Sequence, residues 1–295
     1  MDIKQVLVLG GAGFLGSHVA DALSKVGYAV RIFDRVYSPY KRPDQEMIVG
    51  DILDAKAVDY AVEGCQAVYN FAAIADLNDA LHKPMDTVHI NILGNVHVME
   101  ACRHHQVARY VYASTIYVYS REGSFYRCSK QAAENYIEEY QRVYNLDYTI
   151  LRYGSLYGAR SDESNGLYRI VSSALETRQV RYQGSPEALR EYIHVDDAAR
   201  ASVVALGDEF RNESIVLTGQ EPMRVHDLLK MLAEIMGLPE DAVQFVDSNY
   251  VGHYTRTPYA YQPKLGRKYI PPMHIDLGQG LLQLINEIKD RMEVC

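Results

Sequence analysis

Residues 6–23 read VLVLGGAGFLGSHVADAL: four strand-forming apolar residues, a cluster of glycines, and then a helical pattern. Gly10, Gly13 and Gly16 give the spacing G-x-x-G-x-x-G. After a strand, such glycines allow a tight turn, close approach of the backbone to a pyrophosphate, and close packing of the next helix. The N-terminus of that helix supplies free N–H groups and a partial positive charge. This segment therefore predicts a turn that binds a dinucleotide.

The first half of the chain alternates short apolar runs with helical patterns, which predicts a parallel sheet covered by helices on both faces. After about residue 153 the pattern loosens into shorter elements, and a last helix is expected from about Leu277. The expected fold class is α/β, a Rossmann-type doubly wound parallel sheet followed by a smaller mixed α/β domain. Residues 1–152 are predicted to form the cofactor domain and 153–295 the substrate domain, with segments around 176–210 as candidates to return to the first. The expected strands are 6–9, 29–33, 47–49, 67–70, 109–113 and 147–151, and the longest expected helices are 84–105 and 126–144.

A carboxylate at the end of the second expected strand indicates which dinucleotide is bound. Asp34 lies about 20 residues after the glycines, where an acid meets the adenine ribose hydroxyls. Because a carboxylate repels a 2′-phosphate, Asp34 favours NAD over NADP, whereas the neighbouring Arg35 can accommodate that phosphate. Asp51 and Ile52, after the third strand, are candidates for the adenine end, and a helix-entry role for Asp51 is the equal alternative.

Two later stretches carry acid–base chemistry. YVYASTIYVYS predicts a strand that ends in Ser114 and Thr115, and FYRCSK places Tyr126 and Lys130 four residues apart. On a helix this spacing puts the phenol and the ammonium on one face. A neighbouring ammonium favours phenolate and lowers the tyrosine pKa toward the working pH. Tyr126 is therefore the expected general base, with the Thr115 hydroxyl on the same substrate oxygen; a surface tyrosine–lysine pair is the alternative.

In order and spacing, these motifs resemble those of extended short-chain dehydrogenase/reductases of the NAD-dependent epimerase/dehydratase family, which act on nucleotide sugars. The similarity runs nearly end to end, through GGAGFLGSHV, GDILD, YNFAAIAD, HINILGNVHVMEAC, YASTIYVYS, YRCSK, LRYGSLYGAR and REYIHVDDAA. It implies that Thr115, Tyr126 and Lys130 are catalytic, that NAD is the cofactor, and that no metal is needed. The cofactor-binding residues predicted from motif and resemblance are Gly10, Gly13, Phe14, Leu15, Gly16, Asp34, Arg35, Asp51, Ile52, Phe71, Ala72, Ala73, Asn91, Ser114, Tyr126, Lys130 and Tyr153. The substrate-binding residues implied are Thr115, Tyr117, Tyr126, Ser155, Arg190 and Arg256, with surface salt-bridging as the alternative for the two arginines.

Two departures from the family pattern lie beside the catalytic hydroxyl. Dehydrating relatives carry acidic residues directly after it, whereas Ile116 and Tyr117 follow Thr115 here, which disfavours dehydration. Only eleven positions separate Thr115 from Tyr126, fewer than in relatives. The shorter loop predicts a more open site, or closure by another segment such as 250–261.

The leading prediction for the activity is a nucleotide-sugar 4-epimerase, which oxidises C4 transiently with NAD and reduces the 4-keto sugar from the other face. The alternative is a nucleotide-sugar 4-dehydrogenase or ketoreductase with an exchangeable cofactor. A 4,6-dehydratase ranks below these, and a non-catalytic NAD-binding scaffold ranks last. Ser155 stands where many relatives have an asparagine against the diphosphate, so the sugar and the base stay open.

Charge and composition limit the partners. A net charge of −8 argues against nucleic acid, whose binders carry a basic surface. No apolar run approaches the ~20 residues that cross a bilayer, and four scattered cysteines fit a reduced, cytoplasmic protein. The resemblance implies a homodimer through helices 84–105 and 126–144. Its expected apolar surface consists of Val96, Val98, Met99, Ala132, Ala133, Tyr136 and Ile137. Ordinary packing of these side chains on the sheet is the alternative, and one helix can do both.

Overall fold

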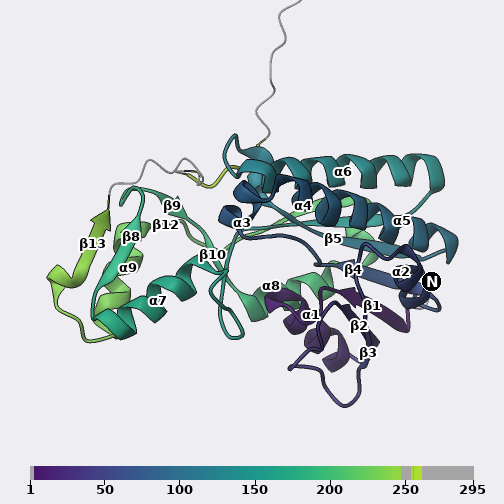
Figure 1. Cartoon of the computed structure of the whole chain (residues 1–295), viewed down its shortest axis with the longest axis horizontal. Coiled ribbons are helices and arrows are strands. Elements are labelled where there is room, and N and C mark those ends of the chain that lie inside the picture. The colour runs from purple at the N-terminus through teal and green to yellow at the C-terminus, as the bar shows by residue number, and fades with distance from the viewer. Residues whose placement is uncertain (1–2, 247–253, 255, 261–295) are drawn as a thin grey trace, which may run out of the picture. The chain divides into compact units, whose positions relative to one another are not determined.

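The structure, a computed structural model, describes residues 3–246, 254 and 256–260 (Figure 1). Contacts divide the chain into two units, 1–262 and 263–295, and every described residue belongs to the first. The helix expected from Leu277 and part of the segment 250–261 lie outside the described residues.

A seven-stranded parallel sheet forms the centre of the first unit, in the order β11-β6-β5-β4-β1-β2-β3. The chain starts in the middle of the sheet, adds β2 and β3 on one side, and then crosses over to β4 on the other side. Val6 of β1 pairs with Val30 of β2 and with Ala67 of β4, so β1 and β4 flank the point where the winding direction changes. Ligands of such sheets bind at the carboxyl ends of the strands at this point. The expected doubly wound fold is confirmed; the strands of the sheet are β1 Gln5–Leu9, β2 Ala29–Asp34, β3 Glu46–Val49, β4 Ala67–Asn70, β5 Arg109–Thr115, β6 Tyr148–Tyr153 and β11 Glu213–Leu217.

Helices cover both faces of the sheet because successive side chains of each strand point to opposite sides. Leu7 and Leu9 of β1 pack in a cluster with α2, α5 and α6, whereas Val6 and Val8 pack with α1 and α8. Full burial of each such side chain contributes roughly 1.5–3 kcal/mol. The helices are α1 Phe14–Lys25, α2 Ala55–Val62, α3 Leu77–His82, α4 Pro84–Val88, α5 Asn95–His104, α6 Ser124–Tyr144, α7 Gly166–Thr177, α8 Val195–Val204 and α9 Val225–Ile235, with a π-helix η1 at His89–Gly94 and 3₁₀ turns η2 Ile116–Tyr119, η3 Asp208–Phe210 and η4 Glu240–Ala242.

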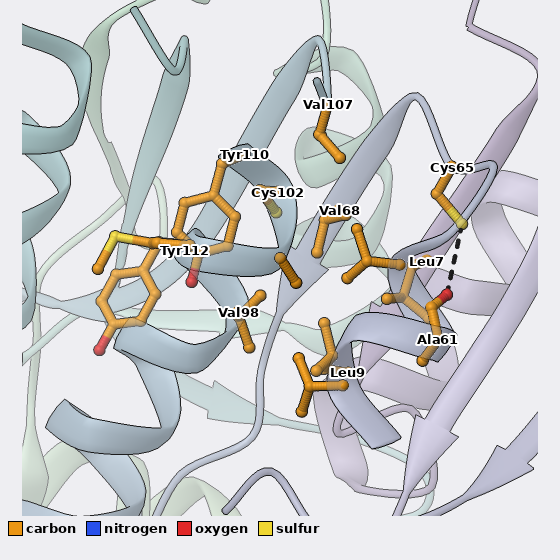
Figure 2. Packing of buried hydrophobic residues seen from close by; sticks show 14 of the residues in the cluster. Leu7, Leu9, Ala61, Cys65, Val68, Val98, Cys102, Val107, Tyr110 and Tyr112 are labelled. Carbon is orange, nitrogen blue, oxygen red and sulfur yellow. Dashed lines mark hydrogen bonds between the residues drawn. The ribbon is translucent and has the colours of Figure 1, made fainter. Parts of the chain in front are cut away.

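Figure 2 shows the cluster on the α2, α5 and α6 face. Tyr110 and Tyr112 of β5 project from the strand into it, and both rings are buried. The Cys65 thiol reaches the Ala61 carbonyl oxygen at 3.7 Å, and burial raises the pKa of this thiol to about 11. Such a protonated, enclosed thiol fills space in the core rather than reacting.

Polar side chains fix where several helices begin. Asp54, Asp76 and Asn165 each accept hydrogen bonds from two backbone N–H groups at the starts of α2, α3 and α7. These groups have no partner within the helix, so a side-chain cap satisfies them. The single helix expected over 84–105 is present, but η1 interrupts it with one wider turn.

A second group of elements follows β6. Strands β8 and β13 pair in parallel, and α7 and α9 pack with them around a small apolar cluster that includes Val180 and Leu229. Helix α8 packs against α1, and β11 pairs with β6, so part of the second half completes the main sheet and its helix layer. The boundary at residue 152 stays a prediction. The remaining strands are β7 Ser155–Tyr157, β8 Val180–Gln183, β9 Leu189–Arg190, β10 Tyr192–His194, β12 Met223–Arg224 and β13 Val243–Val246. Over the described part of the chain, no helix is long and apolar enough to span a membrane.

Candidate active site

The glycine turn joins β1 to α1 with no room for side chains at two positions. Gly10 has a φ of +74°, and a Cβ there would lie 2.6 Å from the backbone nitrogen of Ala72, in the loop after β4. A Cβ on Gly16 would lie 2.2 Å from the carbonyl oxygen of Gly10. Helix α1 therefore begins in close contact with the glycine turn. Phe14 and Leu15 are its first residues, and its N-cap, Gly13, has no side-chain oxygen to cap the helix. The first N–H groups of α1 are thus left for an anionic group.

The Asp34 carboxylate lies directly against this turn. Its Oδ2 accepts a hydrogen bond from the Ala12 N–H at 3.0 Å, and Oδ1 accepts one from the Val36 N–H at 3.3 Å. The neighbouring Arg35 is exposed. The structure thus places a carboxylate at the carboxyl end of β2, beside the glycines, as the sequence predicts.

Asp51 and Ile52 take different environments after β3. Asp51 is exposed and accepts a hydrogen bond from the Leu53 N–H at 2.9 Å, in the turn that leads into α2. Ile52 is buried against Gly94, where a Cβ would come within 2.9 Å of its side chain. The observed hydrogen bond fits the helix-entry alternative for Asp51.

The loop after β4 is held by two buried asparagines. Asn70 accepts a hydrogen bond from the Ala72 N–H at 3.1 Å, which sets the backbone of Phe71, Ala72 and Ala73 beside Gly10. The Asn91 amide, in the π-helix, binds both the N–H and the carbonyl of Ile74 and also the Ser129 hydroxyl. Asn91 therefore ties this loop to α6, and π-helical turns of this kind are frequent at functional sites.

The three predicted catalytic residues meet where β5 ends and α6 begins. Thr115 is the last residue of β5, and its side chain forms a hydrogen bond with Tyr126, in the first turn of α6. The Lys130 Nζ lies 5.8 Å from the centroid of the Tyr126 ring. The short connection is spanned by η2 and by Gly123, which has a φ of +95°. The eleven-position spacing is thus sufficient for Thr115 and Tyr126 to meet.

Burial dominates the protonation of this group. It raises the pKa of Tyr126 to about 12, and the hydrogen bond with Thr115 opposes the shift. It also lowers the pKa of Lys130 to about 7, against the attraction of Glu134. The expected lowering of the Tyr126 pKa by Lys130 is not seen, because the Lys130 Nζ binds the Ala113 carbonyl oxygen at 2.6 Å and lies 4.5 Å from the centroid of the Tyr112 ring.

A buried ion pair behind the catalytic residues was not predicted. Ser114, expected to contact the cofactor, donates its hydroxyl to Glu134 at 2.5 Å. Arg152 of β6 binds both oxygens of Glu134, at 3.0 and 2.7 Å, and also the Tyr119 hydroxyl at 2.5 Å. Glu134 follows Lys130 by four residues on α6, which was the available sign that both lie on one face.

Tyr153, predicted to lie near the nicotinamide, is buried at the end of β6. Its hydroxyl forms a 2.6 Å hydrogen bond with the Ser202 hydroxyl on α8, and its ring centroid lies 6.5 Å from that of Phe71. The phenol oxygen is therefore directed to the α8 layer, while the ring borders the loop after β4.

Tyr254 connects three of the predicted substrate-binding residues. The Arg190 guanidinium, only 5% exposed, lies 4.5 Å from the centroid of the Tyr254 ring. That ring lies 4.8 Å from the Tyr117 ring, and its hydroxyl forms a hydrogen bond with Ser155. Arg256, two residues further on, is exposed. Tyr254 itself was not predicted, although the concentration of tyrosine, glycine and proline after residue 250 was the available signal.

The doubly wound sheet, the glycine turn and the Thr–Tyr–Lys set together define an extended short-chain dehydrogenase/reductase. The chain belongs to the NAD dependent epimerase/dehydratase family, whose model matches residues 6–217. The family depends on NAD, so membership of the family confirms the predicted cofactor. Gly10, Gly16 and Asp34 fit this group, because the turn has no side chains to obstruct a pyrophosphate and carries a carboxylate at the ribose position.

Known relatives include 4-epimerases, 4,6-dehydratases and a decarboxylase. A solved UDP-glucose 4-epimerase of Thermus thermophilus in complex with NAD is 27% identical, with a TM-score of 0.78 over 90% of this chain and 95% of that chain. A UDP-glucose 4-epimerase of Thermotoga maritima, solved with UDP-glucose, is 26% identical, with a TM-score of 0.79 over 88% of this chain and 90% of that chain. A dTDP-glucose 4,6-dehydratase of Mycobacterium tuberculosis is 28% identical over 97% of this chain and 93% of its own length. Similarity alone therefore does not separate epimerisation from dehydration.

Proposed function

We propose that the chain is an NAD-dependent nucleotide-sugar 4-epimerase, with a nucleotide-sugar 4-dehydrogenase or ketoreductase as the alternative. The observation that carries this proposal is the meeting of Thr115, Tyr126 and Lys130 at the carboxyl end of β5, with no acidic residue directly after Thr115. Parallel sheets of this type bind their cofactor at the carboxyl ends of their strands, where these three residues also lie.

The roles follow from the geometry. Tyr126 takes the proton of the C4 hydroxyl as general base, and the Thr115 hydroxyl holds the same oxygen. NAD, when bound, would supply the hydride acceptor for oxidation at C4 and the hydride donor for reduction of the 4-keto sugar from its other face. Tyr126 then gives its proton back to the C4 oxygen. Burial raises the pKa of Tyr126 to about 12, and the Thr115 hydrogen bond opposes this shift. The positive nicotinamide ring of NAD, when bound, would favour the ionised phenol further.

The residues after Thr115 favour epimerisation over dehydration. Loss of the C6 hydroxyl requires an acid that protonates the leaving oxygen. Ile116 is buried and apolar, and the Tyr117 ring packs on Tyr254. Neither side chain supplies a carboxylic acid at this position.

The second half of the chain offers groups suited to a diphosphate. A guanidinium binds phosphate oxygens with two parallel hydrogen bonds, and burial strengthens such contacts. Arg190 is held beneath the Tyr254 ring, and the Ser155 hydroxyl reaches the same tyrosine. We assign Arg190, Arg256 and Ser155 to the nucleotide diphosphate, with Tyr117 beside the sugar.

The test starts with the cofactor. The purified protein is denatured, and the released small molecules are identified by mass spectrometry; an epimerase retains NAD at one per chain. The protein is then incubated with UDP-glucose, UDP-N-acetylglucosamine, UDP-glucuronate and dTDP-glucose. Conversion of one sugar to its 4-epimer without net NADH supports the proposal. NADH accumulating with one sugar indicates the dehydrogenase instead.

A variant pair tests the assigned base. Tyr126→Phe is expected to lower kcat by about 10²–10⁴-fold, the usual contribution of a general base. The matched control is Tyr60→Phe, a change of an exposed tyrosine on α2 that leaves turnover unchanged. Unaltered turnover in Tyr126→Phe contradicts the mechanism.

A further inference from the structure

We propose that Asp59, His104 and His105 form a binding site for a divalent transition-metal ion of the zinc type, which joins α2 to the end of α5. The two imidazole nitrogens and one carboxylate oxygen all lie within 4.8 Å of one another. The Nδ1 of His104 lies 2.8 Å from Asp59 Oδ1, and the Nε2 of His105 lies 3.2 Å from the same oxygen. No sequence motif indicates this site, because 45 positions separate Asp59 from His104.

The donor set suits such an ion. Zinc binds histidine nitrogen and carboxylate oxygen at about 2.0–2.2 Å, so tetrahedral donors around one ion lie roughly 3–3.5 Å apart. The two distances to Asp59 Oδ1 are close to this spacing. Two histidines and one carboxylate leave a fourth position for water, as in open zinc sites.

One nitrogen of the cluster is enclosed and meets only the carboxylate. The Nε2 of His105 is inaccessible to solvent, and its one polar contact among the described residues is Asp59 Oδ1 at 3.2 Å, without the direction of a good hydrogen bond. A buried polar atom normally has a partner. A metal ion held between His105 and Asp59 would be a ligand partner for this nitrogen. The hydrogen bond between His104 and the carboxylate gives it no such partner.

The surroundings favour a cation and allow access to it. His104 is the last residue of α5 and His105 its C-cap, where the helix dipole places partial negative charge. The His104 side chain is 68% exposed, so an ion can enter from solvent. Helices α2 and α5 pack against each other beneath the cluster, which holds the donors on a rigid support.

The site is separate from the catalytic residues. His105 lies just before β5, which begins at Arg109, whereas Thr115 is the last residue of that strand. A strand of seven residues is about 20 Å long. The ion therefore lies near the amino end of β5, and the catalytic hydroxyl lies at its carboxyl end. The ion therefore stabilises the packing of α2 on α5 and takes no part in the reaction.

The test is a calorimetric titration of the full chain, freed of metal with a chelator, with Zn²⁺ alone. One saturable site is expected for the unaltered protein at pH 7.5. Loss of an outer partner of a metal site costs about 10–100-fold in affinity, so loss of a ligand in His104→Ala or Asp59→Asn should cost at least about tenfold.

Two controls address other donors. His226→Ala removes an exposed histidine that lies 3.2 Å from Asp227 but has no third ligand in its described surroundings, and Cys128→Ser removes an exposed thiol. Both should bind Zn²⁺ as tightly as the unaltered protein. The proposal is overturned if no saturable binding occurs, if His104→Ala and Asp59→Asn bind unchanged, or if Cys128→Ser alone abolishes binding.

Discussion

The Lys130 Nζ donates a 2.6 Å hydrogen bond to the carbonyl oxygen of Ala113, two residues before Thr115 on β5. The same ammonium lies 4.5 Å from the centroid of the Tyr112 ring. The lysine therefore joins α6, which carries Tyr126, to the strand that carries Thr115. Its position thus holds the start of α6 against the end of β5.

The variant Lys130→Met should retain the fold and lose turnover. It removes the contact with Ala113 and the cation beside Tyr126, and we expect kcat to fall by at least about 100-fold. Far-ultraviolet circular dichroism checks the fold, and epimerisation rates check the activity. Turnover within a few-fold of the unaltered enzyme contradicts the role given to Lys130.

The same variant changes how stability depends on pH. The pKa of Lys130 is about 7 in the folded chain and near its ordinary value of 10.5 when unfolded. Between these values the unfolded chain binds a proton that the folded chain does not, so the free energy of unfolding rises with pH. One group contributes at most about 1.4 kcal/mol per pH unit. Urea unfolding between pH 7 and 9, below the ordinary tyrosine pKa of 10.0, should give a shallower slope for Lys130→Met. Equal slopes contradict the lowered pKa of Lys130.

The buried pair of Arg152 and Glu134 should contribute strongly to stability. Arg152→Met leaves the Glu134 carboxylate, only 6% exposed, without its bidentate partner. Removing one member of a buried pair costs about 3–5 kcal/mol. The matched control is Arg142→Met, which breaks an exposed pair with Glu139 on the same helix and should change little. Urea unfolding measures both, and similar effects of the two variants contradict the prediction.

Gly16→Ala should disrupt the dinucleotide turn. The added Cβ meets the Gly10 carbonyl oxygen at 2.2 Å, so α1 must move away from β1. We expect less NAD in the purified protein and a lower unfolding midpoint. The control is Gly166→Ala at the start of α7, where the nearest described atom lies 4.0 Å from the new Cβ, and NAD content should not change. Full NAD occupancy in Gly16→Ala contradicts the role of close packing between Gly16 and Gly10 in cofactor binding.

The sequence was sufficient for the first six strands of the main sheet, because their signals are local. It did not predict β11, and the catalytic roles of Thr115, Tyr126 and Lys130 stay a prediction. The expected strand 29–33 is observed as β2, one residue longer, since apolar runs and turns fix such elements within a short window. The partners of Glu134 and Tyr254 were not predictable in this way. Arg152 lies on another strand, and Tyr254 contacts residues such as Tyr117 that lie far away in the chain. Which residues of a packed helix are exposed depends on the direction of each side chain. The apolar content of the helix does not give that direction.

Four residues expected on a dimer surface follow the alternative, packing on the sheet. Val98, Met99, Ala133 and Ile137 are buried against the sheet within the single chain, because they face inward from α5 and α6. Tyr136, from the same prediction, is 49% exposed on α6. The other exposed apolar side chains of the two predicted helices include Met85, Val88, Leu93, Val143 and Tyr144.

We propose that these exposed side chains form the interface of a homodimer, and Leu93→Asp combined with Tyr136→Asp tests it. Buried carboxylates without partners are costly, so the double variant should be monomeric at micromolar concentration, where we expect the unaltered chain to be a dimer. Sedimentation velocity measures both species. Tyr60→Asp, a change of an exposed tyrosine on α2, should leave the dimer intact. An unaltered chain that sediments as a monomer, or a double variant that stays dimeric, contradicts this interface.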